Sequence, residues 1–291
     1  MTFELPDLRV GYVALCRTVA RTGRPVEVRG QATRELTGVS LRIDDPADVL
    51  PVGVGRKLNP AIGVAEALQL MGGFTDPELM VALTPTFRQF LNGGVLHGAY
   101  GPRLRPQLPN VLHQLQTDET SRQAVVTLWD PLFDQQEGLR DRPCTIALQW
   151  LLRDDKLEAH THMRSNDVWW GLTYDVYQFT RLQYLLAEQL DVEVGRYHHH
   201  AVSLHAYERD LEGIEGLHSS GSDPKDVRQA GSGLPHNPDD WALTREAAED
   251  VVYLPDREFW ASHGYLHANP VTNFYRHALR GYRARKKEPR G

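Results

Sequence analysis

The sequence has little cysteine and no long apolar run. Its two cysteines, Cys16 and Cys144, lie far apart and match neither a zinc motif nor the dense pattern of a disulfide-stabilised secreted domain. We expect reduced thiols in a cytoplasmic protein, and a single disulfide is the alternative. No segment reaches the ~18 consecutive apolar residues of a membrane helix, and the first residues show no basic region followed by an apolar run. The sequence therefore predicts neither a transmembrane helix nor a signal peptide.

An excess of basic charge is also absent. The 291 residues carry a formal net charge of -6, which argues against nucleic acid as a partner. Apolar residues make up 41% and charged residues 24% of the chain, as in a globular protein with a sizeable core. A chain of this length forms one large domain or two small ones.

Hydrophobic periodicity predicts a mixed α+β protein. Apolar residues recur at helical spacing in some segments and alternate in others. The expected helices cover 8–23, 61–73 and 174–190, and the third is apolar enough to lie buried at the centre. The expected strands lie within 26–43, 122–130, 144–152, 156–165 and 195–211.

Composition changes after residue 216. The segment 217–239 is rich in glycine, serine, proline and aspartate, which is typical of a loop. A helical stretch and a basic tail follow it. We therefore expect a core over residues 1–216 and a divergent section, 217–291, that packs on the same domain.

Cys144 is the candidate nucleophile. It follows Pro143 at the start of an apolar strand, and Arg140 and Arg142 precede it. A cationic neighbourhood lowers the pKa of a thiol and favours the thiolate, which is the reactive form. The alternative is a small buried hydrophobic residue, because free cysteine is often buried.

The segments around Cys144 resemble the thymidylate synthase family. In that family a Pro-Cys pair and a strand are followed by an Arg-Ser-x-Asp-x-x-x-Gly motif. Here Pro143 and Cys144 are followed by "RSND", residues 164–167, and by Gly171. Further segments resemble family motifs in the same order, namely 29–41, 65–73, 98–105, 118–131 and 203–210. The resemblance covers residues 10–212.

The resemblance implies a fold, a chemistry and a set of site residues. The fold is α+β, with a large mixed sheet at a homodimer interface and flanking helices around a central buried helix. Cys144 is expected to attack C6 of a pyrimidine nucleotide, and C5 then takes the one-carbon unit of 5,10-methylenetetrahydrofolate. The other implied roles are Glu66 and Tyr100 at the reacting base, Arg29, Arg164, Ser165 and the partner-directed Arg122 at phosphate, His205 and Tyr207 at the sugar, and Asp167 and Trp169 at folate.

Several positions depart from the family pattern. Gln123 stands where a second arginine usually follows Arg122, Thr145 replaces the histidine after the nucleophile, and Gln69 replaces a tryptophan. The C-terminal sequence "RARKKEPRG" also does not resemble the apolar tail that closes over folate in the synthases. We therefore expect a site that admits water during the last step.

Asp175 carries the substrate prediction. The family's synthases have asparagine at this position, and its amide pairs with O4 and N3–H of uracil. Cytosine presents the reverse pattern, which a neutral carboxyl group matches by accepting from N4 and donating to N3. Apolar neighbours raise a carboxyl pKa and favour that neutral form. In another arrangement the proton sits on N3 and the carboxylate balances it. A structural alternative is that Asp175 caps the helix that follows.

Aspartate at this position is the mark of the family's cytidylate hydroxymethylases, in which water adds to an exocyclic methylene. The resemblance thus implies that CMP or dCMP becomes its 5-hydroxymethyl derivative. The alternatives are a uridylate-active synthase or hydroxymethylase and an inactive nucleotide-binding relative. Ribose and deoxyribose are not distinguished, so both phage DNA modification and antibiotic biosynthesis stay open.

A run of histidines does not change this prediction. His198, His199 and His200 are adjacent on an expected strand, so their side chains alternate between the two faces and cannot converge on one ion. His160 and His162 can share a face, but no carboxylate or cysteine stands at an evident ligand spacing. We therefore expect no metal site.

Overall fold

The computed structural model describes residues 1–47, 49–51, 53–73, 77, 80–81 and 84–218. Its centre is one mixed sheet of eight strands in the order β1-β3-β8-β6-β5-β4, with β2 beside β3 and β7 beside β8. The strands are β1 (Thr2–Leu5), β2 (Arg24–Val28), β3 (Gln31–Ile43), β4 (Val125–Thr127), β5 (Thr145–Arg153), β6 (Lys156–Met163), β7 (Asn166–Asp167) and β8 (Glu193–Tyr207).

The sheet contains both parallel and antiparallel pairs of strands. β8 runs antiparallel to β3 but parallel to β6, and β6 and β5 form an antiparallel hairpin. The helices are α1 (Leu8–Thr22), α2 (Pro60–Gly72), α4 (Gly101–Leu104), α5 (Leu108–Thr117), α6 (Pro131–Asp134), α7 (Leu172–Gln189) and α8 (Leu211–Glu215), with 3-10 turns η1 (Pro85–Phe90) and η2 (Glu208–Asp210). The predicted α+β class is thereby confirmed.

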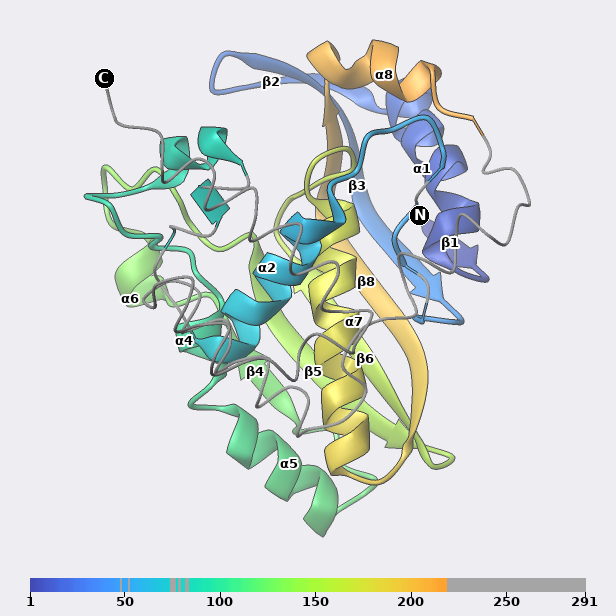
Figure 1. Cartoon of the computed structure of the whole chain (residues 1–291), viewed down its shortest axis with the longest axis vertical. Coiled ribbons are helices and arrows are strands. Elements are labelled where there is room, and N and C mark those ends of the chain that lie inside the picture. Colours follow the sequence, from blue (N-terminus) through green and yellow to red (C-terminus); the bar gives the residue numbers. More distant parts are fainter. Residues whose placement is uncertain (48, 52, 74–76, 78–79, 82–83, 219–291) are drawn as a thin grey trace, which may run out of the picture.

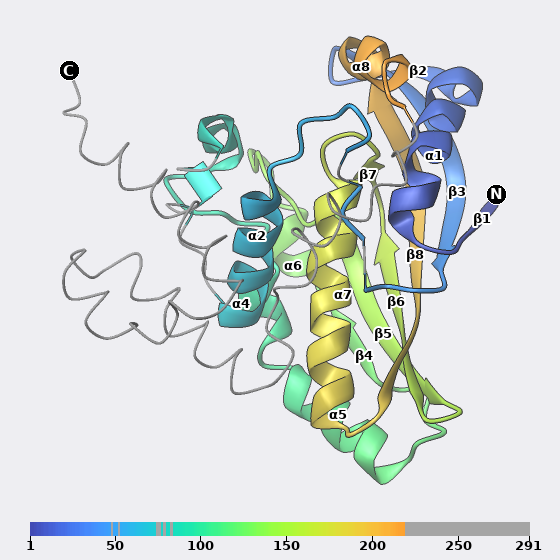
Figure 2. The same cartoon turned by 45° about the vertical axis from the view of Figure 1, so that its right-hand side comes forward.

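Helix α7 is the predicted central helix. It lies along one face of the sheet, and α2 packs on its outer side, as Figure 2 shows. Most of its side chains are buried, including Val176, Phe179 and Leu182. Near its C-terminal end Nε2 of Gln183 donates to the carbonyls of Leu157, Gly195 and Arg196 at 2.8, 3.0 and 3.2 Å. One side chain thus joins the helix to strand β6 and to the start of β8. Figure 1 shows these two strands next to α7.

A tight hairpin joins β2 and β3. Its two loop residues, Arg29 and Gly30, have φ values of 52° and 73°. Positive φ at both positions is the signature of a type I′ turn, which matches the twist of the flanking strands. Arg29 is therefore held at the tip of a defined turn.

The strand expected within 122–130 is shorter in the structure, and the expected C-terminal section is not described by it. Within 122–130 only β4 forms, because Leu128 N–H and Trp129 N–H both donate to the Ile146 carbonyl and interrupt the ladder. From residue 219 onward the predicted C-terminal section lies outside the described residues. No helix in the described part is long and apolar enough to cross a membrane.

Candidate active site

Cys144 immediately precedes β5 and lies against Arg164. The Arg164 N–H donates to the Cys144 carbonyl at 2.9 Å, and its Nε donates to the Pro143 carbonyl at 2.9 Å. This brings NH2 of Arg164 to 3.7 Å from Sγ of Cys144. The backbone of the nucleophile loop thus fixes a guanidinium beside the thiol.

The expected effect of Arg140 and Arg142 on the thiol is wrong. The Arg142 guanidinium instead donates to the carbonyls of Asp134, Leu139 and Gln136. Burial raises the pKa of Cys144 to about 11, and Arg164 and Arg29 lower it only in part. The resting site therefore holds a thiol, and burial outweighs the cations.

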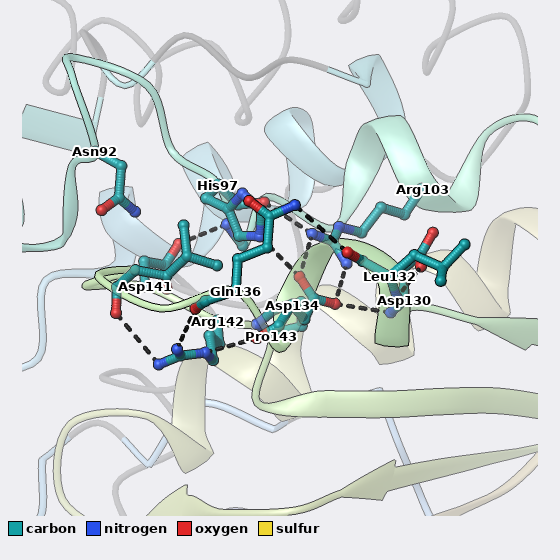
Figure 3. A network of polar contacts seen from close by, with 12 residues as sticks. Asn92, His97, Arg103, Asp130, Leu132, Asp134, Gln136, Asp141, Arg142 and Pro143 are labelled. Atoms are coloured by element: carbon teal, nitrogen blue, oxygen red, sulfur yellow. Dashed lines mark hydrogen bonds and ion pairs between the residues drawn. The ribbon is translucent and has the colours of Figure 1, made fainter.

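A buried ion-pair network supports the loop that leads to Cys144 (Figure 3). The fully buried carboxylate of Asp134 accepts from NH1 and NH2 of Arg103 at 2.6 and 2.7 Å. It also contacts Nε2 of His97 at 2.8 Å and accepts from the backbone N–H of Asp130 at 2.7 Å. Burial alone would raise the pKa of Asp134, but the hydrogen bonds led by Arg103 lower it overall. No sequence motif predicted this network.

Asp175 and Glu66 share a donor between helices α7 and α2. Nε2 of Gln178 lies 3.3 Å from Oδ1 of Asp175 and 3.2 Å from Oε2 of Glu66. Burial raises the pKa of Asp175 to about 7, although the hydrogen bonds from Asn166 and Gln178 oppose the rise. Burial and the charge of Asp175 also raise the pKa of Glu66 well above its usual value. Two carboxyl groups that tend to keep a proton near neutral pH thus lie together.

Asp175 does not cap helix α7, so that alternative is wrong. Gly171 is the N-cap residue, and the backbone N–H of Asp175 already donates to the Gly171 carbonyl at 3.0 Å. The carboxyl group instead accepts from Nδ2 of Asn166 at 2.8 Å. Its side chain is therefore free of a capping role.

A chain of buried polar groups orients Asn166. Its Oδ1 lies 3.0 Å from Nε2 of His199, and Nδ1 of His199 lies 3.1 Å from the Tyr197 hydroxyl. Because Asn166 presents its NH2 to Asp175, its oxygen must accept, so Nε2 of His199 carries the proton. Burial lowers the pKa of His199 to about 3, which keeps the ring neutral. Nδ1 then accepts from Tyr197, whose oxygen lies 2.8 Å from Oγ1 of Thr161.

Tyr100 lies next to Cys144, the predicted nucleophile. Its hydroxyl oxygen accepts from the backbone N–H of Thr145 at 3.3 Å, and its ring stacks on Phe179 with centroids 5.8 Å apart. Burial, followed by the charges of Asp175 and Cys144, raises the pKa of Tyr100 well above its usual value. The hydroxyl therefore stays protonated beside the reacting thiol.

The predicted phosphate-binding residues are only partly brought together. Arg164 lies at Cys144, Ser165 follows it, and the charge of Arg29 also acts on Cys144. Arg122 is different. The pairing of Val125 with Gln149 places it near the far end of β5 from Cys144, where it is exposed. Within this chain Arg122 does not reach the site.

Strand β8 places the predicted sugar-binding pair next to the predicted folate residue. The rings of His205 and Tyr207 meet edge to face with centroids 5.4 Å apart. His205 pairs with Asp167 across the β7–β8 ladder. Burial raises the pKa of Tyr207, and burial likewise raises that of Asp167, although the charge of His205 lowers the latter.

The predicted folate residues form a turn before α7. Oδ1 of Asp167 accepts from the backbone N–H groups of Trp169 and Trp170 at 2.8 and 3.2 Å. Its Oδ2 makes no hydrogen bond to another described residue and can accept from a ligand. The guanidinium of Arg56 lies 4.8 Å from the Trp169 ring centroid, and the Trp170 side chain is exposed.

Sequence comparison gives relatives of one family. The model of the thymidylate synthase family matches residues 10–224. A deoxyuridylate hydroxymethyltransferase of Bacillus phage SP01 is 32% identical over 67% of this chain and 56% of its own length. A deoxyuridylate hydroxymethyltransferase of Pseudomonas phage M6 is 29% identical over 71% and 63%, and a thymidylate synthase of Bacillus licheniformis is 30% identical over 43% and 48%.

The chain thus spans about 56–63% of the length of the phage relatives. The matched region contains the sheet, the buried helix α7, and the cysteine with its adjoining arginine and tyrosine. By this match, the chain belongs to the thymidylate synthase family.

Proposed function

We propose that this protein is a folate-dependent cytidylate 5-hydroxymethyltransferase acting on CMP or dCMP. The observation that carries the proposal is the buried carboxyl group of Asp175, whose pKa is raised to about 7 beside the nucleophile. With this pKa, about half of the Asp175 carboxyl groups are neutral at neutral pH. A neutral carboxyl group donates a hydrogen bond through its O–H and accepts one at its other oxygen. Cytosine needs that combination at N3 and N4.

Each chemical role falls to a residue near Cys144. Sγ of Cys144 adds to C6 of the base, and C5 becomes the carbon nucleophile. Because the resting thiol has a raised pKa, Arg164 and Arg29 stabilise the thiolate that forms. They also bind the nucleotide phosphate together with Ser165, since guanidinium suits a phosphate dianion. Glu66 and Tyr100 hold protons at the base.

The co-substrate we propose is 5,10-methylenetetrahydrofolate, which supplies a one-carbon unit at the oxidation level of formaldehyde. Two observations support a folate site at the turn before α7. Asp167 keeps one oxygen available for a donor on the pterin, and Trp169 offers an aromatic face. Loss of the C5 proton expels tetrahydrofolate and leaves an exocyclic methylene group. Water adds to this group to give the hydroxymethyl group, and Cys144 leaves C6 as the thiolate, which restores the aromatic ring.

We also propose that the protein works as a homodimer paired through the sheet. The side chains of Val125, Ile146 and Val202 are exposed on described strands, with 43%, 36% and 63% of their surface accessible. Exposed apolar groups on a sheet favour a protein partner. Arg122, which does not reach the site of its own chain, is available to the phosphate site of the second copy.

The second candidate is hydroxymethylation of a uridylate. It is favoured by the phage relatives whose names are deoxyuridylate hydroxymethyltransferase. The ionised fraction of Asp175 would face O4 of uracil and repel it, which is why we place cytidylate first.

The test is a side-by-side assay with CMP, dCMP and dUMP. Each nucleotide is incubated with protein, formaldehyde and tetrahydrofolate, and the product is identified by mass. We expect a 5-hydroxymethyl cytidylate without dihydrofolate formation. Turnover of dUMP but of neither cytidylate refutes the cytidylate assignment. Absence of turnover and of tritium release from C5 of all three nucleotides refutes the enzymatic assignment.

A further inference from the structure

Four histidines gather on the face of the sheet that points away from α7. On β6, Thr161 is buried on the α7 side, so His160 and His162 project from the opposite side. The parallel register pairs His160 with His198 and His162 with His200. Cross-strand pairing thus sets four imidazoles into two adjacent pairs.

The pair His160 and His198 is the closer one. Their ring centroids are 4.3 Å apart and the planes differ by 4°, against 4.9 Å and 15° for His162 and His200. Glu158 precedes His160 by two residues and therefore projects from the same face. Its Oε2 lies 3.9 Å from Nε2 of His198. The expectation that no carboxylate stands at a ligand spacing from these histidines is therefore wrong.

The ring nitrogens of this pair lack partners. Nε2 of His160 and Nε2 of His198 are shielded from solvent and accept or donate no hydrogen bond within the described residues. A buried polar atom without a partner costs about 1–3 kcal/mol. By contrast, Nδ1 of His200 lies 3.0 Å from Oγ of Ser40. The unmet bonding capacity is thus specific to His160 and His198.

We propose that Glu158, His160 and His198 bind a divalent transition-metal ion, with zinc as the best fit. One ligand atom of each residue lies within 4.8 Å of those of the other two. Two ligands come from positions i and i+2 of one strand and the third from the neighbouring strand, so small side-chain rotations bring all three onto one ion. These residues lie on strands β6 and β8, and the proposed metal site does not depend on the proposed reaction.

The donor set selects the kind of ion. Two imidazole nitrogens and one carboxylate oxygen suit zinc, whereas magnesium and calcium prefer oxygen ligands alone. A histidine ligand binds the ion through a neutral ring, so bound zinc should be released as the pH falls.

Arg196 competes with the ion for Glu158. NH1 of Arg196 lies 4.0 Å from Oε1 of Glu158, on the oxygen that does not face His198. The charges of Arg196 and Arg42 also act on His198. Positive charge beside the site weakens binding of a cation, so removal of Arg196 should strengthen it.

The experiment is a zinc titration of the full chain by equilibrium dialysis, with bound metal measured by mass spectrometry. We expect about one zinc per chain, with affinity reduced at least tenfold in His160→Gln and His198→Gln and increased in Arg196→Gln. His113→Gln is the matched control, since His113 is exposed on α5, away from the cluster. Circular dichroism of each metal-free variant checks that the fold is kept.

A cobalt titration identifies the ligands. Nitrogen and oxygen ligation gives visible d–d absorption without the intense thiolate charge-transfer band that Cys144 or Cys16 would produce. Equal zinc affinity in the wild type, His160→Gln and His198→Gln overturns the proposal. A thiolate band, or zinc binding no tighter than the nonspecific binding of other histidine-bearing surfaces, overturns it as well.

Discussion

Nδ2 of Asn166 donates a hydrogen bond of 2.8 Å to Oδ2 of Asp175. The other end of the same amide is held by His199, so the amide cannot flip without breaking a buried contact. The donor that faces the Asp175 carboxyl group is thereby set by a residue on β8. Asn166 acts through Asp175 and is a positioning residue in the proposed reaction.

Asn166→Ala should change the pH dependence of cytidylate turnover. The Asn166 hydrogen bond lowers the pKa of Asp175, so its removal raises that pKa above about 7. If the neutral acid reads cytosine, kcat/KM falls as pH rises through this pKa, and the variant moves the fall to higher pH. Gln178→Ala should shift it in the same direction, since Gln178 also donates to Asp175. A profile that drops in height without moving contradicts the positioning role.

Asp175→Asn should transfer preference from cytidylate to uridylate. The amide donates to O4 and accepts from N3–H, which mismatches cytosine. We expect the ratio of kcat/KM values to change by roughly a hundredfold or more, measured in competition between dCMP and dUMP. Asp167→Asn is the matched control, because it should weaken use of folate and leave the ratio unchanged. An unchanged ratio in Asp175→Asn rules out base reading by this residue.

Alkylation of Cys144 by iodoacetamide should be slow at neutral pH and accelerate up to about pH 11, the raised pKa of its thiol. Arg164→Gln removes a cation that lowers this pKa, so the rate at a given pH should fall. Mass spectrometry of peptides from the protein measures how much of each cysteine is alkylated. Cys16 serves as the internal reference, since it is fully buried and burial raises its pKa to about 12. Rapid alkylation at pH 7 indicates that the thiolate is already formed.

A mixture of Arg122→Ala and Cys144→Ala subunits should recover activity that neither variant has alone. In a mixed dimer, the chain that keeps Cys144 receives an intact Arg122 from its partner. Random pairing of equal amounts then restores about a quarter of the wild-type sites. Activity is measured after co-refolding, and refolding of each variant alone is the control. No recovery means that Arg122 does not act across the interface.

Asp134→Asn should destabilise the protein by about 3 kcal/mol, because it leaves the Arg103 charge without its buried partner. Urea unfolding measures the change. Glu4→Gln, which breaks the exposed pair with Arg42, should cost less than about 1 kcal/mol. The pKa of Asp134 is lowered by folding, so its stabilisation is present above the unfolded-state pKa and is lost as pH falls through the folded-state value. The difference between wild type and variant should therefore shrink in acid, and a constant difference contradicts the ion pair.

Local patterns predicted the fold well. The expected helices of residues 8–23, 61–73 and 174–190 correspond to α1, α2 and α7, and the strands expected within 26–43 correspond to β2 and β3. These features depend on periodicity and turn chemistry, which are determined by residues close together in the sequence. The family resemblance then named the nucleophile and the residues around it.

The electrostatics of the site could not be predicted in the same way. Arg140 and Arg142 are close to Cys144 in sequence, yet the Arg142 side chain bonds to loop carbonyls, and the cation at the thiol is Arg164. Asn166 and His199 are 33 residues apart and meet only because β7 pairs with β8. Side-chain direction and strand pairing decide such contacts, and sequence spacing does not reveal them.

The three carbonyls that hold Gln183 have a consequence for the proposed choice of substrate. They belong to the backbone of two segments, so ordinary side-chain substitutions there leave the attachment intact. Asp175, Gln178 and Gln183 lie on one helix. A rotation of that helix about its long axis would move the carboxyl group of Asp175 away from Asn166. If Asp175 reads the base as proposed, its angular setting is therefore governed by the Gln183 amide, further along α7.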